Sequence, residues 1–380
     1  MSSLSRLTFA AASLVAVSSV SAATLYWDTN GTTTGYGSPA SGNWTDADWA
    51  TASGGTAATS GWVDGSIAQF QGSTGAYTVT IGANTTITAA GISVTNSTAA
   101  ITIAGADPTT SVLNSTVSSG NNWGMATGNS VKFTNLTGNF TGGTFNGQGS
   151  TTTIGDNATI TVSFTSQGSN GSSIAINGSN AKLILGSGVS SLGTVGGTTQ
   201  GTVAISNGTL SLQGGAVTYT NVGTLTLSGT GIIDNTTNPT AILSIGNTSF
   251  AKNVVMSGGT WKLALASLTS GAGANQIVAA NAGGVFTITG GTLDLGGGSI
   301  NYGVSYNILS GFSNTSSVSG LTISGYDSAN YIATLANTGV LSFTAVPEPS
   351  TYGLIGAGAL AGVAMLRRRK RGRGTGIPPV

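Results

Sequence analysis

The sequence predicts an all-β fold and, within that class, a parallel β-helix, which is a solenoid of short stacked strands. Apolar and polar residues alternate in runs of three to six residues, as in Tyr77 to Ile81 and Thr224 to Leu227. Glycine, asparagine or serine flanks each run, which is typical of short strands joined by tight turns. A phrase that begins with Gly-Thr also recurs through the second half of the chain. A β-sandwich, whose strands are equally short, is the alternative fold.

The recurring phrase is Gly-Thr-Leu or Gly-Thr-Trp followed by alternation, and it starts at Gly208, Gly223, Gly259 and Gly291. The intervals between its copies are unequal, which fits one or two coils of a solenoid without a strict period. Stacked rungs pair their strands about 4.8 Å apart, and at roughly 20 to 25 residues each the chain would hold about a dozen of them. The phrases resemble the autotransporter-associated β-strand repeats of Gram-negative surface proteins. This resemblance implies a solenoid over about residues 77 to 343.

The body of the chain, from Ala23 to Ala345, is almost uncharged. It holds four lysines and nine aspartates, with no arginine, glutamate or histidine, so its net charge is −5 although the whole chain carries +1. Nucleic acid is not an expected partner, because phosphate binding needs clustered lysine or arginine. The low-complexity composition, with 61 glycines, would also suit a disordered chain, but such chains lack regularly placed apolar residues. We expect an ordered body without disulfides, since the chain has no cysteine.

The N-terminal residues 1–22 have the features of a secretory signal peptide. Arg6 precedes an apolar stretch from Leu7 to Val17, and Val20-Ser21-Ala22 supplies the small residues at which signal peptidase cuts. The stretch is too short for a stable membrane span. We therefore expect a cleaved signal helix and an exported protein.

The next segment, residues 23–76, is rich in tryptophan. It holds four of the six tryptophans of the chain: Trp27, Trp44, Trp49 and Trp62. A solenoid must cover its first rung, and large aromatic side chains do this well, so the segment is predicted to be an N-terminal cap. The alternative is carbohydrate binding, in which the four tryptophans stack on sugar rings and neighbouring aspartates accept hydrogen bonds from sugar hydroxyls.

The C-terminal residues combine three features in a fixed order. A box, Val346-Pro347-Glu348-Pro349, comes first, and 17 uncharged residues follow from Ser350 to Leu366. A basic cluster then consists of Arg367, Arg368, Arg369, Lys370 and Arg371. As a helix the uncharged stretch would be about 26 Å long, just short of the roughly 30 Å core of a bilayer. We expect a transmembrane helix whose basic end stays in the cytoplasm, with a permanent tail anchor as the alternative.

This order of box, helix and basic cluster resembles the PEP-CTERM sorting signal of Gram-negative bacteria. The resemblance implies processing by an exosortase, a membrane-embedded cysteine enzyme. It also implies an intermediate anchored in the inner membrane, followed by release to the cell surface or the extracellular matrix. The expected organisation is a signal peptide (1–22), a tryptophan-rich cap (23–76), a solenoid body (77–345), the sorting signal (346–373) and a short tail (374–380).

The sequence offers almost no catalytic chemistry. Without histidine or cysteine there is no imidazole base, no thiol nucleophile and no site that uses these metal ligands. Asp46 and Asp48 are the one close pair of carboxylates, too few ligands for calcium. We expect no catalytic residue, no metal and no cofactor, and hence a non-enzymatic structural protein of the cell surface or matrix. A carbohydrate-binding or adhesive module is the alternative, with exopolysaccharide as its partner.

Overall fold

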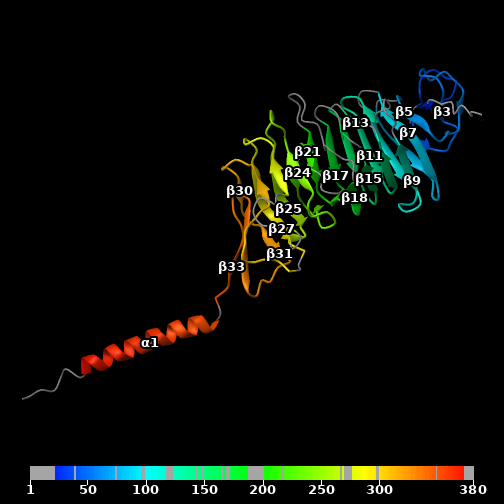
Figure 1. The fold of residues 1–380 in the computed structure, drawn as a ribbon. Coiled ribbons are helices and arrows are strands. Elements are labelled where there is room, and N and C mark those ends of the chain that lie inside the picture. Colours follow the sequence, from blue (N-terminus) through cyan, green and yellow to red (C-terminus); the bar gives the residue numbers. More distant parts are fainter. Residues whose placement is uncertain are drawn as a thin grey trace, which may run out of the picture.

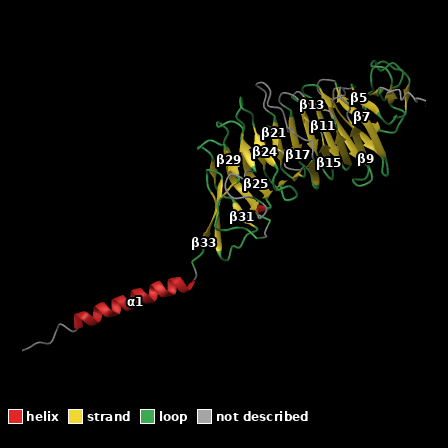
Figure 2. Ribbon diagram, in the orientation of Figure 1, coloured by secondary structure: helices red, strands yellow, loops and turns green. Residues whose placement is uncertain are grey.

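The computed structural model shows an elongated stack of β-strands, with helix α1 (Pro349–Arg371) beyond its C-terminal end (Figures 1 and 2). It describes residues 22–37, 40–72, 75–95, 99–116, 123–142, 144–147, 149–163, 166–167, 172–186, 201–214, 218–265, 268, 276–296, 299–347 and 349–371. The predicted signal peptide lies outside these residues, except for Ala22, and so does the predicted tail. In Figure 1 the strands stack in chain order, from blue at the N-terminal end to orange beside α1.

Each turn of the stack contributes strands to three faces, and along each face strands of successive turns pair in parallel. Face 1 consists of β1 (Thr24–Trp27), β5 (Ser66–Phe70), the second half of β7 (Thr86–Val94), β10 (Trp123–Met125), β13 (Thr144–Gly147) and β16 (Ser166–Gln167). In later turns, the strands that follow face 3 in the chain form a separate parallel sheet. These strands are β21 (Thr218–Val222), β24 (Ile242–Ile245), β26 (Ile277–Ala279) and β29 (Leu309–Ser310).

Faces 2 and 3 run the length of the body. Face 2 consists of β2 (Gly42–Asn43), β6 (Gly75–Ile81), β8 (Ala99–Gly105), β11 (Ser130–Thr134), β14 (Thr151–Ile154), β17 (Ser173–Ile176), β19 (Thr202–Ile205), β22 (Thr224–Leu227), the first parts of β25 (Val254–Lys262) and β27 (Phe286–Asp294), and β30 (Ser317–Val318). Face 3 consists of the first half of β7, β9 (Val112–Thr116), β12 (Thr137–Thr141), β15 (Thr159–Ser163), β18 (Ala181–Leu185), β20 (Gly208–Leu212), β23 (Ile232–Asp234), the last parts of β25 and β27, and β31 (Thr322–Ser324).

The core of the solenoid is a set of columns, because the inward residue of one strand lies beside the inward residue of the next turn. On face 3, Leu183, Leu210 and Ile233 are neighbours in register, and all three are buried. The outward residues between them are polar or half-exposed, as the alternation in the sequence predicts. Parallel pairing between successive turns confirms the β-helix, and it excludes the β-sandwich, whose sheets are antiparallel.

The register explains the uneven spacing of the Gly-Thr phrases. The copies at Gly208, Gly259 and Gly291 lie on face 3, whereas the copy at Gly223 precedes the face 2 strand β22. The rungs also vary in length. On face 2 the step from Phe133 to its neighbour Ile154 is short, and the step from Val254 to its neighbour Phe286 is much longer. Successive turns therefore differ in length, so the Gly-Thr phrases cannot recur at a strict period.

The corner between faces 2 and 3 is a tight turn that needs a left-handed backbone. In four turns an asparagine supplies it, with φ of 54° at Asn84, 53° at Asn135, 53° at Asn157 and 58° at Asn180. Asparagine tolerates this conformation better than other residues with a side chain. In a later turn Gly259 takes the same place, with φ of 74°.

Replacing Gly259 by alanine is expected to destabilise the solenoid more than replacing Gly65, although both have a positive φ. Gly65 has φ of 84° and open space where a Cβ would lie, so alanine there adds only the left-handed penalty, roughly 1–2 kcal/mol. At Gly259 a Cβ would also lie 2.5 Å from the carbonyl oxygen of Gly231 in the previous turn. Urea unfolding followed by circular dichroism measures both variants. Equal losses of stability would show that the turns at this corner are loosely packed.

Antiparallel strands close both ends of the solenoid. At the N-terminal end β3 (Trp49–Ala50) pairs with β1 and with β4 (Thr59–Ser60). At the C-terminal end β33 (Val340–Ala345) pairs with β28 (Tyr306–Asn307) and β32 (Tyr331–Leu335). Parallel pairing already starts inside the predicted cap, because β5 pairs with both β1 and β7. The cap and the first turn of the solenoid thus share residues.

The C-terminal helix is present where the sequence predicts it. In the part of the chain that the structure describes, no helix is both long and apolar enough to cross a membrane.

Candidate functional site

The predicted sorting box begins at the last residue of the folded body. Ala345, the end of β33, pairs with Tyr331 of β32. The next residue, Val346, donates its backbone N–H to the carbonyl oxygen of Asn330 at 2.8 Å, and 38 % of its surface is exposed. Pro347 is exposed and Glu348 lies outside the described residues. The box therefore follows the C-terminal antiparallel sheet without a linker.

Helix α1 projects away from the solenoid (Figure 1). It starts at Pro349 and ends at Arg371, so it contains the predicted apolar stretch and the basic cluster. All residues from 356 to 368 are exposed, including Leu360 at 74 % and Met365 at 71 %. Arg367 and Arg368 are exposed too, and the side chains of Arg369, Lys370 and Arg371 lie outside the described ones. The apolar side chains of the described helix are thus open to contact with another molecule.

The last strand of the β-solenoid is followed directly by a box, an apolar helix and a basic cluster. This arrangement defines a class of protein: a folded domain with a C-terminal sorting signal. Residues 345–370 match the family model of the PEP-CTERM protein-sorting motif. The motif implies that an exosortase processes the chain, and that the protein is exported and sorted to the cell surface. No curated protein and no solved structure matches the chain.

Three of the four predicted sugar-binding tryptophans form the core of the N-terminal cap. Trp27, Trp44 and Trp49 have no exposed surface. The ring centroid of Trp49 lies 5.0 Å from that of Trp27 and 5.3 Å from that of Trp44. The indole N–H of Trp27 donates to the carbonyl oxygen of Ala40 at 2.6 Å, and that of Trp49 to the carbonyl oxygen of Trp44 at 2.8 Å. In this arrangement the three rings present no face to a ligand.

Trp62 is the tryptophan of this group that keeps some exposed surface. Its ring packs on Trp49 at 4.7 Å and on Trp44 at 5.4 Å. Its indole N–H donates to Asp64 Oδ1 at 2.9 Å, and the same oxygen accepts the backbone N–H of Thr88 at 2.9 Å. Of the four tryptophans predicted to stack on sugar rings, Trp62 is therefore the one with exposed ring surface. The Asp64 oxygen beside it already accepts two hydrogen bonds.

The aspartates of the cap serve local structure. Asp46 Oδ2 accepts the backbone N–H and the side-chain amide of Asn43, both at 3.0 Å. Burial raises the pKa of Asp48 above its ordinary value, and the negative charges of Asp46 and Asp28 raise it further. Among the described residues no group of three acidic, histidine or cysteine side chains is placed to hold a metal ion.

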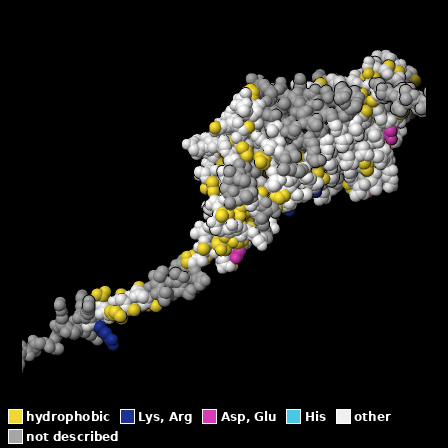
Figure 3. Space-filling view, viewed as in Figure 1, with side chains coloured by type: hydrophobic (Ala, Val, Ile, Leu, Met, Phe, Trp, Pro, Cys, Tyr) yellow, Lys and Arg dark blue, Asp and Glu magenta, His cyan; other side chains and the backbone are white. Residues whose placement is uncertain are grey.

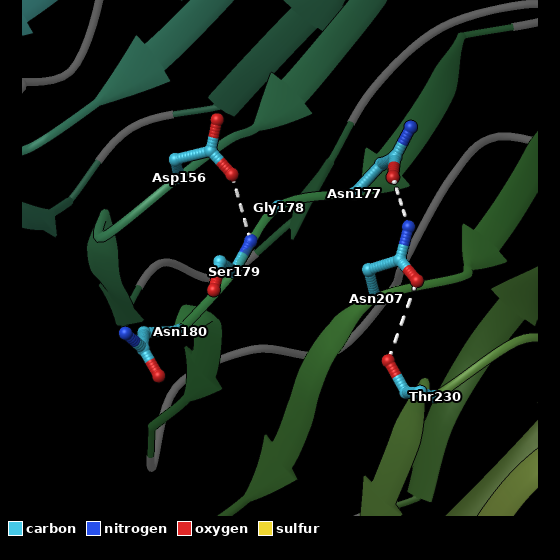
Figure 4. Close-up of a pocket in the computed structure, with 7 residues that line it drawn as sticks. All are labelled: Asp156, Asn177, Gly178, Ser179, Asn180, Asn207 and Thr230. Carbon is cyan, nitrogen blue, oxygen red and sulfur yellow. Dashed lines mark hydrogen bonds between the residues drawn. The ribbon is translucent and has the colours of Figure 1, made fainter.

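A polar hollow lies at the corner between faces 2 and 3, and its residues do not stand out in the sequence. Its volume is about 630 Å³, and it is lined by Asp156, Asn177, Gly178, Ser179, Asn180, Asn207 and Thr230 (Figure 4). The sequence pattern that could have identified this hollow is a polar residue one or two positions after the inward isoleucine that ends a face 2 strand. This pattern occurs after Ile154, Ile176 and Ile205. A regular rung length would have been needed to align these positions.

Proposed function

We propose that this chain is a non-enzymatic structural protein of the bacterial cell surface or extracellular matrix, delivered by its sorting motif. The observation that carries the proposal is the direct junction between a β-solenoid closed at both ends and the matched motif. Because the ends of the solenoid are covered and the C-terminal helix is exposed, the motif can be bound while the body stays folded. Signal peptidase at the N-terminus and exosortase at the C-terminus are the processing partners.

The chemistry of the body supports a structural role over an enzymatic one. Between Ala23 and Ala345 the side chains are mainly hydroxyl, amide and small apolar groups. On the face shown in Figure 3, acidic and basic side chains are sparse along the described solenoid. Stability of such a body comes from inward columns and backbone pairing between turns, which lets it act as a rigid spacer. A kinship with autotransporter-associated repeats fits the same role and is part of the proposal.

The exosortase contact is assigned to α1 and the box before it. The exposed side chains of Leu360, Val363 and Met365 supply an apolar surface, and the exposed Arg367 and Arg368 mark its end. Because the box follows β33 without a linker, the enzyme would act beside a folded sheet.

Deleting Pro347 to Pro349 is expected to abolish processing, because the box is the part of the motif that membrane anchoring does not require. The measurement is the apparent size and location of the protein in cells that contain an exosortase. An unprocessed precursor should accumulate, and the surface fraction should fall at least about tenfold. Deleting Gly374 to Gly376, three residues beyond the basic cluster, is the matched control and should leave processing intact. Unchanged size and location of the box deletion would refute the sorting role.

The second candidate function is carbohydrate binding. It is favoured by the polar hollow at the corner of the solenoid rather than by the tryptophans, because three of these are buried.

A further inference from the structure

The hollow at the corner between faces 2 and 3 spans four successive turns of the solenoid. Asp156 follows β14, Asn177 to Asn180 follow β17, Asn207 follows β19, and Thr230 follows β22. Because these strands are consecutive on face 2, the groups recur at the spacing of the rungs, about 4.8 Å. In Figure 4 Asn177, Asn207 and Thr230 form one row, and Asp156, Ser179 and Asn180 lie across Gly178 from it.

Hydrogen bonds between turns hold both rows in place. In the first row Asn207 Nδ2 donates to Asn177 Oδ1 at 2.8 Å, and Thr230 Oγ1 donates to Asn207 Oδ1 at 3.3 Å. In the second row Asp156 Oδ1 accepts the backbone N–H of Ser179 at 2.7 Å. Asn180 Nδ2 donates to Asn157 Oδ1 at 3.0 Å. The polar groups are therefore ordered before any ligand arrives, which lowers the entropic cost of binding.

Several polar atoms of the hollow keep bonding capacity. Among the described residues, no hydrogen bond engages Asp156 Oδ2, Asn177 Nδ2 or the hydroxyl of Ser179. These atoms are an acceptor, a donor and a group that does both. A ligand with hydroxyl groups can complement all three, because each hydroxyl also donates and accepts.

The lining excludes other classes of ligand. It has no lysine or arginine, so it offers no counter-charge to a phosphate or sulfate. Its single carboxylate is too few for a calcium site, which takes about six to eight oxygen ligands. It has no aromatic or large aliphatic side chain, so it does not suit a lipid or an apolar peptide.

We propose that this hollow binds an uncharged polysaccharide, whose chain lies along the solenoid axis and places successive sugar hydroxyls on successive turns. Asn177 Nδ2 donates to the sugar hydroxyls, and so does the second N–H of Asn207 Nδ2, whose first N–H is bonded to Asn177. Asp156 accepts from the hydroxyls and repels acidic sugars. The proposal rests on the proposed surface location, because polysaccharide chains are found at the cell surface.

The test is isothermal titration of the full chain with three uncharged probes: cellohexaose, mannohexaose and xylohexaose. At least one should bind, and the double substitution Asn177→Ala with Asn207→Ala should weaken binding about tenfold, since two or three modest hydrogen bonds are lost. Asn139→Ala is the matched control. Its Nδ2 also donates to an asparagine of the neighbouring turn, Asn114 Oδ1 at 2.9 Å, but it lies on face 3 outside the hollow. Its binding should equal that of the parent chain.

A charge substitution tests the role of Asp156. Asp156→Asn should keep affinity for the uncharged hexaose within about threefold. It should also strengthen binding of oligogalacturonate, an acidic probe, because the repelling carboxylate is gone. Circular dichroism and urea midpoints of all variants check that the fold is kept.

The inference is overturned if no uncharged hexaose binds, or if Asn139→Ala weakens binding as much as the double substitution. Its failure can be told apart from failure of the proposed function, because export and processing are measured separately. Normal processing without hexaose binding would refute polysaccharide binding by the hollow and leave the proposed function intact. Hexaose binding in a chain that is neither exported nor processed removes the proposed surface role.

Discussion

Replacing Trp49 by alanine should destabilise the N-terminal end of the solenoid by about 3–5 kcal/mol, the usual cost of deleting a buried large aromatic side chain. Trp49 has no exposed surface, and its ring centroid lies 5.0, 5.3, 4.7 and 5.8 Å from those of Trp27, Trp44, Trp62 and Phe70. Its loss also leaves the carbonyl oxygen of Trp44 without its indole donor. Trp49 is therefore the centre of the aromatic cluster in the cap.

Tryptophan fluorescence during urea unfolding measures this effect, because four of the six tryptophans lie in the cap. The transition of Trp49→Ala should move to lower urea while the circular dichroism of the later turns changes little, since each turn contacts mainly its neighbours. Trp62→Ala is the control, because Trp62 is only partly buried and its removal should cost markedly less. Equal shifts for the two variants would contradict the assignment of Trp49 to the core of the cap.

Replacing Leu210 by aspartate should prevent folding of the middle of the solenoid, with a cost above about 4 kcal/mol, because it buries an unpaired charge. Leu210 has no exposed surface, and its neighbours in register are Leu183 and Ile233. These two apolar neighbours offer no partner for a carboxylate. The yield of soluble protein and the unfolding midpoint in urea both report the loss.

The control is the adjacent residue on the same strand. Thr209 points outward, and in register it lies beside Lys182 of the previous turn. Thr209→Asp should change the free energy of unfolding by no more than about 1 kcal/mol, with a favourable contribution from the opposite charge across the strands. If Thr209→Asp were the more damaging change, the inward and outward assignments of β20 would be reversed.

Many of the short strands could be predicted from the sequence. The alternating run from Tyr77 to Ile81 lies within β6, and the run from Thr224 to Leu227 is β22. The period of two residues is a property of the strand itself, so it can be recognised without knowing which strand lies beside it. The sorting segment is predictable for the same reason, because its box, helix and basic cluster are consecutive in the chain.

The neighbours of each strand could not be predicted. Ile233 is the partner of both Leu210 and Trp261, yet the segment around it carries no Gly-Thr-Leu phrase. Turns of unequal length blur any period, since the loops between the faces differ in length. The hollow could not be predicted either, because its two rows come from four turns that only the register aligns.

The sequence by itself determined the strand-forming runs, the uncharged body and the C-terminal address, all of which depend on residues close together in the chain. The tertiary structure decided which residues are inside. It placed Trp27, Trp44 and Trp49 in the core of the cap, although aromatic composition alone would equally suit a sugar-binding surface. It also placed Asp156, Asn177 and Asn207 together at one corner. The physical reason is that burial and proximity in a parallel β-helix depend on pairing between turns, over separations that local patterns do not encode.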